Sequence, residues 1–220
     1  MSSESRPFPC VFGVAGYRQD QLRYLFLDQL DAEALGEQLA QFVAESRSYG
    51  PNTSLVVFTR PGPVQTIDAY HRKFWLLLDQ LAQIDKSPWP AGIPEQTDHP
   101  MWEFSFAGEP IFVVCSTPAH VMRQSRRSST LMLTFQPRWV FEKILGTEKA
   151  AEAAFAEVRK RLIPYDSTSP SPLLGRYGNH DGREHQQYFL HDENHQALGC
   201  PFAKLAQTKT SKIEGTEQAA

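Results

Sequence analysis

Three short β-rich runs between residues 101 and 136 constrain the fold of this chain more than any other feature. The runs "MWEFSF" and "PIFVVC" flank Ala107-Gly108, which is the turn chemistry of a hairpin, and "LMLTFQ" follows as a third strand. Pro110 favours an edge or the start of a strand. An earlier run, "SLVVFT", is bounded by turn residues and predicts one more buried strand.

Helical periodicity surrounds these strands. Apolar residues recur at spacings of three and four from Gln21 to Ser46, where Asp31 can cap a second segment, and again after Thr66 over residues 67–85. Two more helices are predicted over residues 138–145 and 147–162. Helices that come first and strands that then cluster predict an α+β fold, a single domain whose largely antiparallel sheet is packed by helices.

The carboxyl-terminal part of the sequence differs in composition. From Pro164 onward Ser, Pro, Gly, Asn and His dominate, and only "QYFLH" resembles a strand. The last stretch, "AQTKTSKIEGTEQAA", has little apolar surface to bury. We therefore expect one domain over residues 1–205 and a disordered tail over residues 206–220.

Charge and cysteine usage exclude several classes of protein. A net charge of −3 gives no overall attraction to nucleic acid or anionic lipid, and no run approaches the roughly 20 apolar residues that cross a bilayer. No signal-peptide pattern precedes the first helix. Three distant cysteines indicate a reducing compartment rather than a disulfide framework. We expect a cytoplasmic protein that binds neither nucleic acid nor membrane, and the edge-like strand permits a homodimer.

A histidine and several arginines follow the second strand of the hairpin, in "TPAHVMRQSRR". One neutral imidazole, His120, can ligate iron, and the guanidinium forks of Arg123 and Arg126 can hold the carboxylate tails of a macrocycle. The same pattern also suits a surface histidine beside a solvated basic turn.

Each of the three cysteines is an alternative iron ligand, because thiolate sulfur suits haem iron. Cys115 lies inside an apolar run, where a thiol is usually an inert part of the core. Cys10 in "FPCVFG" and Cys200 in "GCPF" stand next to proline in irregular chain, where a ligand is easier to present.

A carboxylate in the first strand of the hairpin is a candidate for binding a cation. Alternation in "WEFSF" places Trp102, Phe104 and Phe106 on one face of the strand and Glu103 and Ser105 on the other. If that second face lines a cavity, Glu103 can pair with a guanidinium or ammonium group. Otherwise the strand is half exposed and its polar face lies in water.

Histidines and carboxylates also gather near the carboxyl terminus. Two histidines and one carboxylate with open positions make a non-haem iron site, although such a cluster can equally be a hydrated loop. The candidates are His180, His185, His191 and His195 with Asp181, Glu184, Asp192 and Glu193. Phosphate loops, nucleophile elbows and Cys-x-x-Cys zinc pairs are absent from the sequence.

The blocks "FPCVFG", "TPAH", "FQPRWVF" and "CPF" occur in the order typical of the YqcI/YcgG family, which this chain resembles from Phe8 to Phe202. That family includes haem-dependent N-hydroxylases of guanidino compounds. The resemblance implies haem (heme b, iron protoporphyrin) held near His120, Arg123, Arg126 and Trp139, with the cysteines as alternative ligands.

The resemblance also implies a reaction, in which O₂ or peroxide supplies an oxygen atom to a guanidine nitrogen and an unidentified donor supplies electrons. Glu103 would hold the small guanidino or amino substrate. Pocket walls would come from aromatic residues that could equally be core: Trp102, Phe104, Phe135 and Trp139. The alternatives are a haem-binding or haem-sensing protein without turnover and a non-haem iron oxygenase that uses the histidine cluster.

Overall fold

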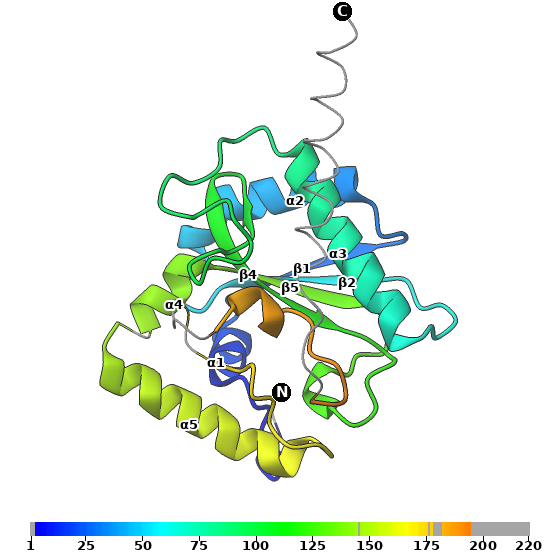
Figure 1. Ribbon diagram of the computed structural model, residues 1–220, viewed down its shortest axis with the longest axis vertical. Helices are drawn as coiled ribbons and strands as arrows, with labels where there is room; N and C mark the ends of the chain where they lie inside the picture. Colours follow the sequence, from blue (N-terminus) through cyan, green and yellow to red (C-terminus); the bar gives the residue numbers. More distant parts are fainter. Residues whose placement is uncertain (1–2, 145, 176, 178–181, 195–220) are drawn as a thin grey trace, which may run out of the picture.

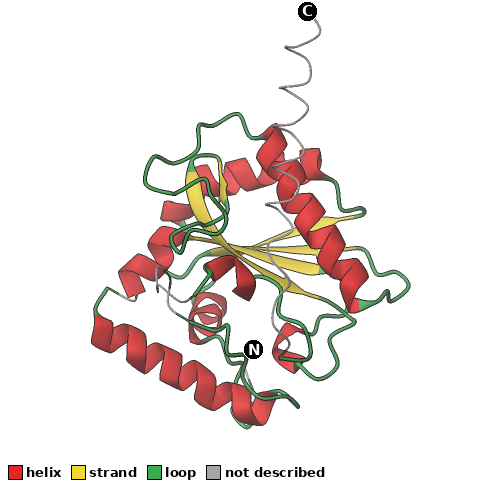
Figure 2. Ribbon diagram, in the orientation of Figure 1, coloured by secondary structure: helices red, strands yellow, loops and turns green. Residues whose placement is uncertain are grey.

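One five-stranded sheet organises the protein, in the computed structural model that describes residues 3–144, 146–175, 177 and 182–194 (Figures 1 and 2). The strand order is β1 (Leu22–Leu27), β2 (Ser54–Thr59), β5 (Met132–Pro137), β4 (Glu109–Ser116) and β3 (Ser105–Phe106). β1 and β2 pair in parallel, and the other three pairs are antiparallel. The expected α+β fold with a largely antiparallel sheet is confirmed.

Helices cover the two faces of this sheet. Figure 1 shows α2 (Ala32–Glu45) and α3 (Ile67–Ile84) on one side, with α1 (Val11–Arg18) and α5 (Glu148–Tyr165) on the other. The short α4 (Arg138–Ile144) begins directly where β5 ends. The side chains of Asp31 and Thr66 cap α2 and α3, since each accepts a hydrogen bond from a backbone amide three residues on.

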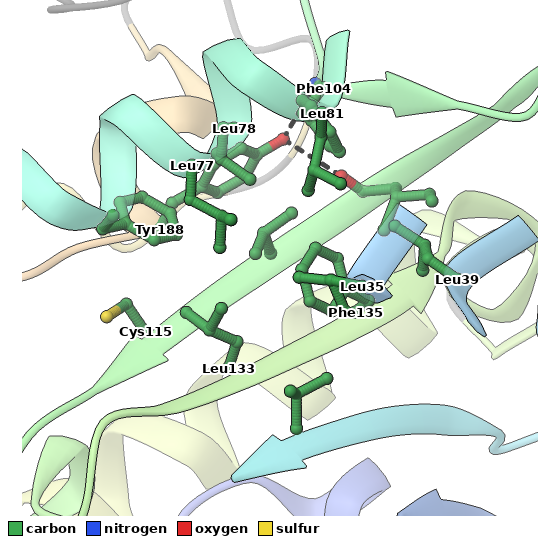
Figure 3. Close-up of a cluster of buried hydrophobic side chains, with 14 of the residues drawn as sticks. Leu35, Leu39, Leu77, Leu78, Leu81, Phe104, Cys115, Leu133, Phe135 and Tyr188 are labelled. Atoms are coloured by element: carbon green, nitrogen blue, oxygen red, sulfur yellow. Dashed lines mark hydrogen bonds between the residues drawn. The ribbon is translucent and has the colours of Figure 1, made fainter. Parts of the chain in front are cut away.

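The core lies between α3 and the sheet. Leu77, Leu78 and Leu81 of α3 face Leu133 and Phe135 of β5, and all five side chains are at most 2% exposed (Figure 3). Burying side chains of this size stabilises the fold by about 1.5–3 kcal/mol each. This packing fixes the sheet on which the candidate site is built.

Residues Leu22–Leu27 form a strand, so the helix predicted from Gln21 to Ser46 is wrong in its first part. The apolar residues of "LRYLFL" fit both periods, but alternate residues are the more buried ones, and parallel pairing with β2 decides the outcome. The helix begins only after its cap at Asp31. Helix α1 is an element that the sequence interpretation did not predict.

The predicted strand "QYFLH" is also wrong. Its first residue closes the short 3₁₀ helix η3 (Glu184–Gln187), and residues 188–191 are irregular. The carbonyl of Tyr188 nevertheless accepts a hydrogen bond from the amide of Cys115, 2.9 Å away. Residues 184–190 therefore border the edge of β4 beyond its short pairing with β3. "MWEFSF" likewise shrinks to the two residues of β3.

Within the described residues, no helix combines the length and the apolar character that a membrane span requires. The tail predicted over residues 206–220 lies outside the described residues.

Candidate functional site

His120 lies just past the end of β4 and is fully buried. Its Nε2 is 2.8 Å from the carbonyl oxygen of Leu190, and its Nδ1 is 2.9 Å from the hydroxyl of Thr117. A carbonyl only accepts, so Nε2 carries the proton and Nδ1 accepts from Thr117. Burial lowers the pKa of His120 to about 4. Both ring nitrogens of His120 are thus hydrogen-bonded within the protein.

Arg123 binds the carboxyl-terminal segment of the described chain. Its Nε donates to the carbonyl of His191 and its Nη2 to the side chain of Asn194, both at 2.8 Å. Nη1 lies 3.9 Å from a carboxylate oxygen of Asp166. The guanidinium predicted to hold a haem carboxylate is thus committed to protein groups.

Arg126 and Asp192 also join the segment after β4 to the carboxyl-terminal segment of the described chain. Arg126 donates from Nη2 to the carbonyl of Gln187 at 3.1 Å, and its Nη1 is buried without a hydrogen-bond partner. The carboxylate of Asp192 accepts from the amides of Val121, Met122 and Arg123 at 2.8–3.1 Å. The segment from His120 to Arg126 therefore anchors residues 187–194. That His120, Arg123 and Arg126 contact haem stays a prediction.

The predicted thiol ligands occupy different environments. Cys115 is fully buried in the core, and burial raises its pKa strongly. Cys10 is partly exposed and caps α1, where its Sγ accepts from the amide of Gly13 at 3.3 Å. Burial raises the pKa of Cys10 as well. Cys200 lies outside the described residues. Among the described thiols Cys10 is the more accessible one, and iron ligation by any of the cysteines stays a prediction.

Glu103 forms a buried ion cluster with two residues that are distant in the sequence. Arg138, the first residue of α4, donates from Nε to Oε2 of Glu103 at 2.6 Å, and its Nη2 lies 2.5 Å from Oε1. The same Nη2 donates to Oε1 of Glu184, in η3. The ring of Tyr177 stacks on this guanidinium, with 3.7 Å from Cζ to the ring centroid. Both carboxylates and the guanidinium are at most 10% exposed.

The cluster has one more carboxyl group than it has guanidinium groups. With both carboxylates ionised, Glu103, Arg138 and Glu184 together carry a net charge of −1. Burial raises the pKa of Glu103 well above its usual value, the charge of Glu184 raises it further, and Arg138 opposes both. Burial, with the charge of Glu103, also raises the pKa of Tyr177 to about 12, so its hydroxyl is neutral. The excess of carboxyl groups favours the binding of an added cation at this cluster.

A cleft of about 230 Å³ opens beside the cluster. Arg138, Glu184, Tyr177 and Glu142 line its polar part, and the rest is mainly phenylalanine from α1, β4, α4 and α5. Among the latter, Phe112 and Phe141 meet edge to face at 5.4 Å. The volume is slightly below the usual range for drug-sized ligands, so it suits a small substrate. A larger hollow of about 390 Å³ beside α1 has none of the predicted site residues in its lining.

The structure does not bring all the predicted site residues together. β4 and β5 are antiparallel, so His120 follows one end of the pair while Arg138, bound to Glu103, follows the other. The six residues of β5 span roughly 17–20 Å. Trp139 stays near the Glu103 end, where the guanidinium of Arg47 lies 5.0 Å from its ring. Glu103 and His120 therefore belong to separate places.

The predicted aromatic walls and the histidine cluster also separate. Trp102, Phe104 and Phe135 are core, at most 1% exposed. His185 is buried with its ring 5.5 Å from that of Trp102, and burial lowers its pKa to about 4. His191 instead lies beside His71, with 5.1 Å between the rings. Three members of the predicted cluster lie outside the described residues: His180, Asp181 and His195. Within the described residues, no group of three or more metal-ligating side chains occurs.

Sequence reasoning missed Arg138 and Tyr177 as site residues, and it placed Glu184 in a metal site. A usable signal existed for Arg138, which follows the buried strand "LMLTFQ" at the position where loops and helix starts present functional side chains. Tyr177 and Glu184 stand in the polar carboxyl-terminal region and show no comparable pattern.

The fold and the cleft define an α+β protein with an acidic, aromatic site at one end of its sheet. The chain belongs to the YqcI/YcgG family, whose sequence model matches residues 2–203. It is similar to two proteins of Bacillus subtilis (strain 168): YcgG, 39% identical, and YqcI, 40% identical, each match covering 93% of this chain and 84% of the relative.

A third similar protein carries a more specific name. The putative N(omega)-hydroxy-L-arginine synthase DcsA of Streptomyces lavendulae is 31% identical over 206 residues, which are 89% of this chain and 77% of DcsA. No solved structure matches the chain.

Proposed function

We propose that this protein N-hydroxylates a guanidino or amino group of a small cationic substrate, arginine being the model. The observation that carries the proposal is the cleft beside buried Glu103, whose polar part is lined by two carboxylates, one guanidinium and one phenol: Glu184, Glu142, Arg138 and Tyr177. The relative named as an N-hydroxy-arginine synthase supports the same reaction.

The residues of this chain bind and orient the substrate. A carboxylate accepts two parallel hydrogen bonds from a guanidinium, which fixes the plane of the nitrogen that reacts. Phenylalanine walls exclude water from that nitrogen, and ion pairs strengthen when water is excluded. Buried Glu103 and Arg138 hold the carboxylate of Glu184 in place.

Haem is the cofactor that we propose, with O₂ or peroxide as co-substrate and an electron donor still to be identified. A bound haem would supply the oxygen activation that protein side chains lack. The proposal rests on the family resemblance, and Cys10 is the described candidate ligand whose exposure favours it.

The turnover test uses the intact protein reconstituted with haem, a reductant and air. Arginine and agmatine are offered separately, and mass spectrometry is expected to find a product that has gained one oxygen atom on a guanidine nitrogen. A protein that binds haem but leaves both compounds unchanged would contradict the proposal and favour a haem-binding or haem-sensing role.

The ligand prediction is tested by absorption spectroscopy of the ferrous carbon monoxide form. We expect Cys10→Ser to change that spectrum, because thiolate and imidazole ligands push electron density to iron differently. Cys115→Ser is the matched control, since this thiol is buried in the core. An unchanged spectrum in Cys10→Ser would remove Cys10 as the ligand.

A further inference from the structure

Building on the proposed function, we propose that Glu184 and Tyr177 form the subsite that contacts the planar cationic end of the substrate. Arg138, which lines the cleft beside them, and Glu103, which does not, are positioning residues. The carboxylate predicted from the sequence, Glu103, is then not the one that touches the substrate. The ligand class is a guanidinium or amidinium on a short aliphatic chain.

The two carboxylates differ in whether they line the cleft. Glu103 is fully buried and does not line the cleft, while Glu184 lines it directly. The guanidinium of Arg138 contacts both carboxylate oxygens of Glu103. The hydrogen bond from Arg138 to Glu184 goes to Oε1, and a carboxylate has a second oxygen with which it can accept from an incoming N–H donor.

Tyr177 already binds a guanidinium, that of Arg138. Its ring lies flat against Cζ of Arg138, and its hydroxyl donates to the carbonyl of Met101 at 2.8 Å, which fixes the ring plane. A ring held in this way is a preformed platform for a planar cation. The contacts of Arg138 thus show that Tyr177 and Glu184 can bind a guanidinium group.

Charge explains why a second cation can bind next to Arg138. The free cluster has one carboxylate more than it has guanidinium groups, and Glu142 of the cleft lining adds further negative charge. Two neighbouring carboxylates repel each other, so one of them tends to retain a proton. The charge of Glu184 is therefore the second cause of the raised pKa of Glu103, after burial. A bound cation offsets the charge of Glu184 and lowers that pKa again.

Binding is therefore coupled to proton release from the cluster. The groups that face Glu103 are Arg138 from α4, Glu184 from η3, and the neutral hydroxyls of Tyr177 and Tyr188. Because the cation displaces a proton, its affinity rises with pH and levels off above the raised pKa of Glu103. At most about one proton leaves per cation bound.

The experiment is titration calorimetry of the intact protein with agmatine and arginine, without reductant, in buffers of different ionisation enthalpy near neutral pH. We expect both cations to bind and protons to be released, and neutral citrulline not to bind. Glu184→Gln should weaken binding roughly 10–100-fold, the loss expected for one charge-assisted pair. Glu103→Gln should weaken binding less than Glu184→Gln does, and it should abolish proton release.

Control variants separate contact from folding. Glu109→Gln alters a carboxylate that pairs with Arg47, and it should leave binding unchanged. Tyr177→Phe keeps the ring and should bind within about threefold of the unmodified protein, whereas Tyr177→Leu should lose roughly 3–30-fold. Melting temperatures confirm that each variant is folded.

Two results would overturn the subsite: unchanged affinity in Glu184→Gln, or binding of neutral citrulline as tight as that of arginine. Both are independent of turnover. Cation binding without hydroxylation would leave the subsite intact and contradict the proposed reaction, while hydroxylation that persists in Glu184→Gln would contradict the subsite alone.

Discussion

Replacing Arg138 with alanine is expected to lower the free energy of unfolding by about 3–5 kcal/mol, the usual cost of breaking a buried ion pair by removing one partner. Glu103 and Glu184 would remain buried without the guanidinium that now bonds to both. Urea denaturation near neutral pH measures the loss.

The pH dependence of this loss identifies its cause. Without Arg138 the pKa of Glu103 rises further above its value in the unfolded chain, so the deficit is largest at high pH and shrinks as the carboxyl groups are protonated. Adding Glu103→Gln to Arg138→Ala should recover part of the stability for the same reason. A deficit that does not change with pH would mean that lost packing, rather than unpaired charge, destabilises the variant.

Truncation of Tyr188 to alanine is expected to cost about 3–5 kcal/mol of unfolding free energy, because a fully buried aromatic side chain leaves a cavity. The ring stacks on Trp75 at 6.3 Å, and the hydroxyl accepts from the amide of Phe104 and donates to the carbonyl of Ile111 (Figure 3).

The matched variant Tyr188→Phe keeps the ring and removes the hydroxyl. We expect it to cost about 1–3 kcal/mol, since two buried backbone groups lose a partner. Equal losses in the alanine and phenylalanine variants would show that the hydrogen bonds, and not the filled volume, dominate at this position.

Local patterns predicted the elements whose packing agrees with their periodicity. Strand β2 and helix α3 with its cap at Thr66 are examples. β1 was mistaken for helix because leucine and aromatic residues suit both periods over six positions, and only the neighbouring strand decides between them. Contacts between distant segments are absent from a local pattern.

The same reason limited the prediction of the site. Glu103 was predicted because strand alternation places it on the face opposite the aromatic residues. Its partner Arg138 lies 35 residues away, and Glu184 lies a further 46 residues beyond. His120 and its arginines were read as ligands because their donors cluster in sequence. Those donors bond to backbone carbonyls within residues 187–191, which lie 61–70 residues further along the chain. No sequence pattern marks these carbonyls as the acceptors.

The border that residues 184–190 form along β4 affects how the chain folds during synthesis. A ribosome must release Tyr188 and Leu190 before the amide of Cys115 and the ring of His120 find their acceptors. Until then β4 has an open edge beyond its pairing with β3, a state in which growing chains pair wrongly with one another. Stalled or shortened products ending before η3 should therefore need chaperones, whereas the longer chain closes its own sheet.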